Sequence, residues 1–217
     1  ELSLSHRGVL FLDELPEFSR AVLENLRQPI ESGEVTLSRV MATLVYPART
    51  LLVAAMNPCP CGYFGQTQHK CRCMMQEVMR YRNRLSGPLL DRIDIQIEVP
   101  PVPLSLLQQK SEAESSEAIR ARVVKARRCQ EKRFAGGRLN AQMGRKDLET
   151  WAWPDVQTGE WLHQAGSKMG LSARSHDRIL RVARTIADLA QEERIHLCHV
   201  QEAVQYRNID KNSEILR

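Results

Sequence analysis

One short stretch near the start of the chain, Gly8 to Pro16 (GVLFLDELP), constrains the fold more than any other. Four consecutive apolar residues, Val9 to Leu12, precede two adjacent acids, Asp13 and Glu14. A short apolar run that ends near a proline is typical of a fully buried parallel strand. In an open α/β sheet, ligands bind at the carboxyl ends of such strands. The sequence therefore predicts an α/β fold with two carboxylates at the ligand-binding rim.

A second apolar run, Thr50 to Met56, predicts another buried strand, which ends at Asn57. If the two strands are close in the sheet, the Asn57 amide lies beside the two acids. Such a set suits a nucleoside triphosphate: Asp13 would hold Mg²⁺, Glu14 would orient or deprotonate a water, and Asn57 would position that water or touch the γ-phosphate. The acids then form a Walker B pattern. The alternatives are two solvated acids and an ordinary Asn-Pro turn.

The segment between these strands has a helix pattern followed by a hairpin pattern. Apolar residues recur at helical spacing from Phe18 to Ile30, with Ser19 as N-cap, Gly33 as the stop and Pro29 as a kink in the last turn. The hairpin pairs two β-rich runs, Glu34 to Leu37 and Thr43 to Tyr46. Its predicted turn, Ser38 to Ala42, contains Arg39 and would present a basic and apolar tip. The alternative is an ordinary edge hairpin.

Four cysteines follow Asn57 in the pattern C-x-C-G-x₈-C-x-C: Cys59, Cys61, Cys71 and Cys73. Clustered thiols in a reducing compartment favour a metal over disulfides, and a thiolate set of four suits structural Zn²⁺. The alternative is a loop with four reduced thiols. A zinc ion here would stiffen a loop attached to the candidate active site and would take no part in the chemistry.

Arg92 lies in the segment SGPLLDRID, ahead of Ile95, Ile97 and Val99, whose alternation predicts a strand. A guanidinium fixed in this way can be presented to the phosphate of a neighbouring subunit. The alternative is a salt bridge to Asp91 or Asp94 within the chain.

Prolines at 100, 101 and 103 mark the first boundary, so we expect domains at 1–100 and 118–217 joined by a linker at 101–117. Lys and Arg balance Asp and Glu up to residue 100, 11 against 11, but outnumber them 20 to 15 afterwards. This excess suits a polyanionic partner or a solvated helical surface.

The helix predicted after Ser172, its N-cap, has a buried face of Ile179, Val182, Ala183, Ile186 and Ala190. Arg174, Arg178 and Arg181 form another stripe near its N-terminus. Cations there oppose the helix dipole unless an anion meets them, which indicates a phosphate partner.

Five segments, in this order, resemble the magnesium-chelatase-like branch of the AAA+ ATPases, and within it the ComM (YifB-like) family: GVLFLDELPEF, LRQPIESGEVTLSR, YPARTLLVAAMNPCPCG, RLSGPLLDRID and VARTIADL. The resemblance covers essentially the whole chain. It implies the second part of an AAA+ P-loop ATPase core, a parallel sheet flanked by helices, followed by an α-helical lid bundle.

The resemblance also implies roles for individual residues. Asp13 and Glu14 match Walker B, Asn57 matches sensor 1 and Arg92 matches the arginine finger. Arg174 matches sensor 2, with Arg178 as the next best register, and the turn around Arg39 matches a pore hairpin that contacts DNA. No G-x-x-x-x-G-K-[ST] phosphate loop occurs in the 217 residues, so we expect the chain alone to be inactive.

The function implied for the intact protein is ATP hydrolysis, with ATP and Mg²⁺, in a homo-oligomeric ring, expected to be a hexamer. In ComM-like proteins that cycle drives DNA translocation and branch migration during recombination in natural transformation. Two alternatives remain open: the motor subunit of magnesium chelatase, which acts in porphyrin metallation, and a non-catalytic zinc-stabilised binding module. We expect a cytoplasmic protein with no membrane partner, because no apolar run approaches the roughly 20 residues of a membrane span.

Overall fold

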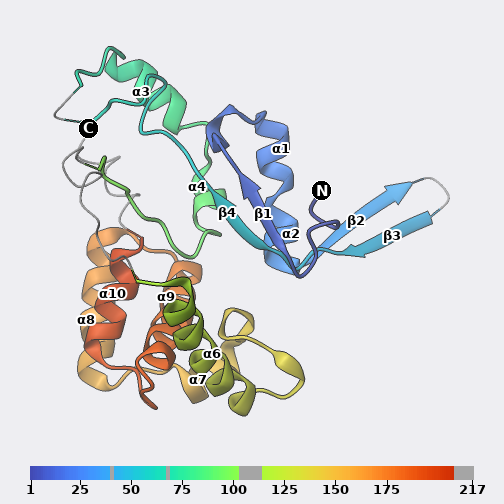
Figure 1. Ribbon diagram of the computed structural model, residues 1–217, viewed down its shortest axis with the longest axis vertical. Helices are drawn as coiled ribbons and strands as arrows, with labels where there is room; N and C mark the ends of the chain where they lie inside the picture. Colours follow the sequence, from blue (N-terminus) through green and yellow to red (C-terminus); the bar gives the residue numbers. More distant parts are fainter. Residues whose placement is uncertain (40–41, 67–68, 103–113, 208–217) are drawn as a thin grey trace. The chain divides into compact units, whose positions relative to one another are not determined.

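The computed structural model describes residues 1–39, 42–66, 69–102 and 114–207, and it divides the chain into two units, Glu1–Ile93 and Asp94–Arg217 (Figure 1). The two units are described separately below. None of the helices within the described ranges combines the length and the apolar character that a bilayer crossing requires.

A parallel pair of strands organises the first unit. Strand β1 (Val9–Leu12) pairs with β4 (Leu51–Ala54), in a register that aligns Val9 with Leu51 and Leu12 with Ala54 (Figure 1). The two predicted strands are therefore direct neighbours that run in the same direction. Their carboxyl ends consequently lie at the same edge of the sheet.

The prediction that both strands are fully buried is wrong. Val9, Phe11, Leu51 and Val53 share one face of the sheet and are 42–63% exposed. Leu12, on the opposite face, packs against a small core of Leu15, Leu23, Leu26, Leu85 and Leu89. Parallel sheets are buried when helices cover both faces. Within the described residues this sheet has two strands and a core on one side, so the other face is open.

Two short helices replace the single helix predicted between the acids and the hairpin. A 3₁₀ turn, η1 (Leu15–Glu17), precedes α1 (Arg20–Asn25) and α2 (Arg27–Ser32). Ser19 caps α1, accepting a hydrogen bond from the Val22 N–H at 3.4 Å, and Gly33 ends α2 with φ 72°, both as predicted. The kink predicted at Pro29 lies earlier than the last turn: the helix is interrupted at Leu26, because Pro29 lacks an N–H for the Asn25 carbonyl and its ring crowds that carbonyl.

The predicted antiparallel hairpin is present, and its strands are longer than expected. Strands β2 (Glu34–Arg39) and β3 (Ala42–Pro47) pair from Glu34 opposite Pro47 to Arg39 opposite Ala42. Ser38, Arg39 and Ala42 are therefore strand residues, and the turn between them lies outside the described residues. Figure 1 shows the hairpin projecting away from the parallel pair, and every residue of β3 is exposed.

Helices α3 (Met75–Arg82) and α4 (Gly87–Leu90) complete the first unit. The strand predicted for Ile95, Ile97 and Val99, at the start of the second unit, is wrong. These three side chains are 51–78% exposed and their backbone has no regular structure. The Gln96 N–H donates to the Tyr206 carbonyl at 2.7 Å, so this segment bonds to the end of a helix and not to a neighbouring strand.

The second unit is the predicted helical bundle. Its elements are α6 (Ser116–Arg133), η2 (Ala135–Gly137), η3 (Asn140–Gln142), α7 (Arg145–Trp151), α8 (Val156–Met169), α9 (Ala173–Leu189) and α10 (Leu197–Gln205). Most of the predicted linker lies outside the described residues, and α6 begins two residues before the predicted Ala118. The core gathers apolar residues of α7 to α10, including Leu148, Leu162, Ile179 and Val200.

The predicted apolar face of α9 is correct except at its end. Ile179 and Ala183 are fully buried, and Val182 and Ile186 pack against the core, but Ala190 is the exposed C-cap. Beside that face lies a buried polar network. Asp188 accepts hydrogen bonds from Arg133 at 2.6 and 2.8 Å, from Arg184 at 3.1 Å and from Asn140 at 2.7 Å.

Candidate functional site

The two acids after β1 lie in a short backbone turn, and a hydrogen bond to Ala55 flanks the turn on each side. The Ala55 N–H donates to the Leu12 carbonyl at 2.9 Å, and the Leu15 N–H donates to the Ala55 carbonyl at 2.9 Å. Between these bonds, Glu14 takes the left-handed conformation, with φ 49° and ψ 46°, and its N–H donates to the Asp13 carboxylate at 2.9 Å. A non-glycine residue in this conformation is strained, and such strain is concentrated at functional sites.

Asn57 lies at the same edge of the sheet, three residues after the end of β4. Asp13, Glu14 and Asn57 are all exposed to solvent. The structure thus brings the two acids and the amide to the carboxyl ends of two neighbouring parallel strands. Their oxygens are hard donors of the kind that Mg²⁺ prefers, and a carboxylate beside them can accept a proton from water.

Tyr81, on the last turn of α3, is a residue of this region that the sequence prediction missed. It is 4% exposed, and burial raises the pKa of its phenol, whereas the nearby polar backbone of Asn57 opposes that shift. The negative charges of Glu17 and Glu14 raise the pKa further. The spacing of Val78, Tyr81 and Leu85 marks a buried helix face, a signal that could have identified this residue.

Arg82, next to Tyr81, also contacts this part of the chain. Its Nε donates to the Pro58 carbonyl at 3.1 Å, and its guanidinium lies 5.1 Å from the centre of the Phe64 ring. The end of α3 is therefore hydrogen-bonded to the Asn57-Pro58 step through the Pro58 carbonyl.

Arg92 is held within its own unit. Its Nε donates to the Glu31 carboxylate at 3.0 Å and one Nη donates to the Pro88 carbonyl at 2.6 Å, and its side chain is 10% exposed. The carboxylate that meets this guanidinium comes from α2, whereas the salt bridge considered from the sequence was to Asp91 or Asp94.

The stripe of cations on α9 has partners in the second unit. Ser172 caps the helix as predicted, accepting from the Ser175 N–H at 3.2 Å. Arg178 forms an ion pair with Asp94 at 2.5 Å, so a carboxylate provides an anion beside this cation. Arg181 donates to the Met143 carbonyl at 3.0 Å, and burial lowers the pKa of its guanidinium. Arg174, in the first turn, is exposed.

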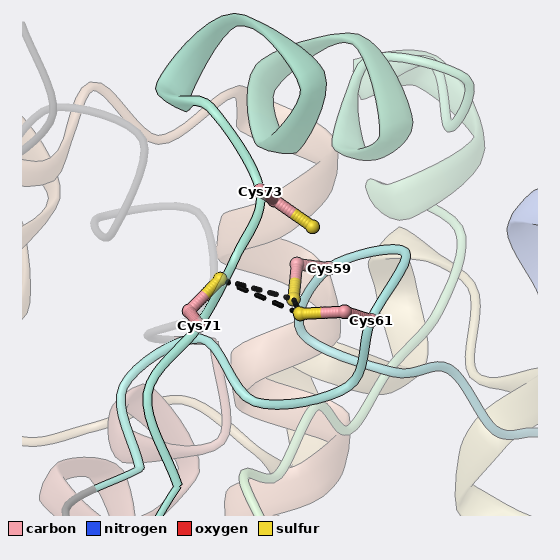
Figure 2. A group of neighbouring side chains, drawn as sticks. All are labelled: Cys59, Cys61, Cys71 and Cys73. Carbon is pink, nitrogen blue, oxygen red and sulfur yellow. Dashed lines mark hydrogen bonds between the residues drawn. The ribbon is translucent and has the colours of Figure 1, made fainter.

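The four cysteines after Asn57 converge from the two ends of one loop (Figure 2). We call this group the thiol cluster: Cys59, Cys61, Cys71 and Cys73. Three of the sulfur–sulfur distances are 3.4, 3.5 and 3.7 Å, and all four sulfurs lie within 4.8 Å of one another. All four are free thiols, with Cys59 fully buried and the others half-buried. The thiol cluster is a group that could bind one metal ion.

The protonation of these thiols reflects their crowding. Backbone hydrogen bonds from Arg72 and Tyr63 lower the pKa of Cys61 to about 6, whereas burial and the Cys61 sulfur raise the pKa of Cys73 to about 12. A metal cation that binds all four sulfurs would stabilise their thiolate forms, because a thiol loses its proton when it coordinates a metal.

Two family models match the chain. The model for magnesium chelatase, subunit ChlI, matches residues 1–107, and the model for the C-terminal part of that subunit matches residues 113–207. The first match includes the acids, Asn57, the thiol cluster and Arg92, and the second includes the helical bundle.

Several curated proteins are similar over nearly all of the chain. Competence protein ComM of Haemophilus influenzae is 48% identical over 208 residues, which are 95% of this chain and 40% of ComM. The uncharacterized protein YifB of Salmonella typhimurium is 46% identical over 212 residues, which are 97% of this chain and 41% of YifB. An uncharacterized protein of Mycobacterium tuberculosis is 38% identical over 208 residues. The chain thus spans about two fifths of the length of these relatives.

Proposed function

Because the chain belongs to the magnesium-chelatase-like family of AAA+ ATPases, we propose that it serves in a ring-forming ATPase that moves along DNA. The observation that carries this proposal is the parallel pairing of β1 with β4. That pairing supports the proposal, because Asp13, Glu14 and Asn57 follow strands whose carboxyl ends share one edge, and open α/β sheets bind ligands at such edges.

The chemistry of the three residues supports binding and hydrolysis of ATP. ATP with Mg²⁺, the cofactors that the family implies, supplies a terminal phosphate with an electrophilic phosphorus. Asp13 offers oxygen ligands for Mg²⁺, directly or through water. Glu14 orients the attacking water and accepts its proton, and the Asn57 amide holds that water or the γ-phosphate in line.

Assembly in a ring follows from the position proposed for Arg92 as an arginine finger. A finger acts on the nucleotide of a neighbouring subunit, so catalysis needs a homo-oligomer, which we propose is a hexamer. The Arg92–Glu31 contact is then a resting contact that exchanges for phosphate at the subunit interface. In the second unit, Arg174 is proposed as sensor 2, and Arg178 would exchange Asp94 for phosphate in the same way.

Helix α6 supports DNA as the partner. It carries seven Lys and Arg against two Glu, an excess of five that equals the formal charge of the whole chain. Lys125, Arg128 and Lys132 are exposed and recur at spacings of three and four, which aligns them along about 10 Å of one helix face. Like charges at this spacing destabilise a helix unless polyanions meet them. Arg39, at the end of β2, is proposed as a second contact to the DNA backbone.

The similarity to ComM connects this motor to competence, the process in that relative's name. We therefore propose branch migration during recombination of incoming DNA as the task, in the cytoplasm. The family models favour a second candidate, the magnesium chelatase motor that acts in porphyrin metallation. The whole-chain similarity to ComM and YifB favours the first.

We also propose that the metal of the thiol cluster is Zn²⁺. Four ligands at 2.3 Å in a tetrahedron place the sulfurs about 3.8 Å apart. The observed separations of 3.4 to 3.7 Å are close to that edge. Metal analysis of the purified protein tests the assignment: we expect one zinc per chain. Iron with visible charge-transfer absorption would refute it.

The experiment for the main proposal is Glu14→Gln in the full-length protein. We expect kcat for ATP hydrolysis to fall about 10²- to 10⁴-fold, the usual contribution of a general base, while ATP binding persists. Glu17→Gln is the matched control, because Glu17 forms an exposed ion pair with Arg84, and its rate should stay within about threefold of the wild type. Equal rates in the two variants would contradict the catalytic assignment.

Binding assays then separate the candidate motors. DNA affinity that falls steeply with salt, and a further weakening when Lys125, Arg128 and Lys132 are replaced by Gln, would support the DNA motor. ATPase activity that responds to porphyrin-handling subunits and not to DNA would support the chelatase. A full-length protein without ATPase activity would leave a non-catalytic zinc module.

A further inference from the structure

We infer that the zinc ion of the thiol cluster fixes the position of Asn57. The ion closes a loop that is connected to the Asn57-Pro58 step at both ends, through the chain at Cys59 and through helix α3 after Cys73. This inference rests on the proposed ATPase function, since it assigns to Asn57 a position that matters for the rate. It also makes a structural prediction that holds whether or not the protein hydrolyses ATP.

The first connection is the chain itself. Asn57 is separated from the buried ligand Cys59 by Pro58 alone, and two residues span at most about 7 Å. Proline fixes its own φ and restricts the preceding residue to extended conformations. Movement of the Cys59 sulfur is therefore transmitted to Asn57 through a short and stiff segment.

The second connection runs through α3. The helix follows the last ligand, Cys73, and its capping box holds the Met74 N–H on the Glu77 carboxylate at 2.8 Å. Its last turn returns to the start of the loop, where the Arg82 Nε donates to the Pro58 carbonyl at 3.1 Å.

The interior of the loop is attached to the same helix. The Arg82 guanidinium stacks over Phe64, which lies between the two pairs of cysteines, and Val78 is fully buried. Helix α3 thus contacts both the loop and the Asn57-Pro58 step. The metal completes this arrangement, because it joins Cys59 and Cys61 at one end of the loop to Cys71 and Cys73 at the other.

Without the metal, these ends have no covalent link. The four thiols are free, and hydrogen bonds between thiols are weak. Closing a flexible loop is entropically unfavourable, so the loop opens when coordination is lost. Asn57 then moves relative to Glu14, and displacements of about 1 Å in a reacting group lower rates by about 10²-fold.

The test compares the full-length protein with and without its zinc. Zinc is removed from the wild type by a chelator and added back, and in parallel Cys61→Ser and Cys71→Ser are prepared, with Cys198→Ser, an exposed cysteine outside the cluster, as the control. Three quantities are measured: zinc content, amide hydrogen exchange in residues 55–60, and kcat and KM for ATP.

We expect zinc-free protein to exchange residues 55–60 at least tenfold faster and to lose about 10- to 100-fold in kcat with little change in KM. Adding zinc back should restore both quantities in the wild type, which separates positioning from misfolding. Cys198→Ser should behave as the wild type. Arg82→Leu should keep its zinc but lose about 2- to 10-fold in kcat, as expected when the one hydrogen bond to the Pro58 carbonyl is lost.

The outcomes distinguish this inference from the proposed function. Unchanged exchange in residues 55–60 after zinc removal would overturn the inference, even if ATP hydrolysis is confirmed. A wild-type protein that binds zinc but hydrolyses no ATP would overturn the proposed function, and faster exchange without zinc would still support the positioning of Asn57. A wild type without zinc would overturn the inference directly.

Discussion

Replacing Asp188 by Asn should destabilise the helical bundle far more than an ordinary surface substitution. Asp188 is 1% exposed and accepts four hydrogen bonds, two from Arg133 and one each from Arg184 and Asn140. Asparagine has the same shape but no charge, and one of its two acceptor oxygens becomes a donor NH₂ group. The substitution therefore removes the anion and turns a donor towards other donors.

The magnitude follows from the burial of the cations that remain. Arg184 is also 1% exposed, and burial lowers the pKa of its guanidinium while the charge of Asp188 opposes that shift. Its bonds to the Glu192 and Glu193 carbonyls persist in the variant, but its counter-charge is lost. Breaking a buried ion pair at one partner costs about 3–5 kcal/mol. At about 4 °C per kcal/mol, the melting temperature of a unit of this size should fall by about 12–20 °C.

The assay is urea and thermal unfolding of the 217-residue chain, followed by circular dichroism at 222 nm. Asp177→Asn is the matched control, because Asp177 is on the same helix but is 29% exposed and lies 3.6 Å from Arg145. We expect the control to change the free energy of unfolding by less than about 1 kcal/mol. Equal losses in the two variants would refute the argument that the buried counter-charge is what matters.

The remaining predictions concern a glycine and a histidine. Gly33→Ala should lower the free energy of unfolding by more than about 1–2 kcal/mol, the usual cost of an alanine in the left-handed conformation. The reason is that a Cβ there would lie 2.8 Å from Cγ of Arg49. Gly65 has φ 81° and nothing within 4 Å of an added Cβ, so Gly65→Ala should show the backbone cost alone. Equal unfolding midpoints for the two alanine variants would contradict the steric argument. His199 is buried, and burial lowers its pKa below 6.5 although the Glu192 carboxylate partly opposes the shift. The native state then binds fewer protons than the unfolded state, so stability should fall as the pH drops below about 6.5. In urea unfolding at pH 7.5 and 5.5, His199→Gln should reduce the difference in the free energy of unfolding between the two pH values. An unchanged difference would contradict the assignment to His199.

Local signals in the sequence were sufficient for the rim of the candidate site. Asp13 and Asn57 each follow a short apolar run, and parallel strands bring their carboxyl ends to one edge, so the neighbouring positions could be predicted from the sequence alone. The caps at Ser19 and Ser172 and the stop at Gly33 were equally predictable, since each depends on one residue and its own backbone.

The features that the sequence did not reveal depend on contacts between distant segments. Arg184 and Asp188 resemble an exposed pair at helical spacing, and only packing against Arg133 and Asn140 makes them a buried network. The alternation of Ile95, Ile97 and Val99 satisfies the strand pattern, but a strand also needs a neighbour, and the Gln96 N–H bonds to a helix end.

The left-handed backbone at Glu14 has an engineering consequence. Glycine would adopt φ 49° without steric penalty, whereas any residue with a Cβ carries about 1–2 kcal/mol of strain there. Glu14→Gly should therefore stabilise the folded protein but remove the carboxylate that could accept a hydrogen bond from water. Selection for thermal stability alone would favour the glycine, whereas the role proposed for Glu14 in ATP hydrolysis would favour the acid. On that proposal, stability and activity place opposite demands on position 14.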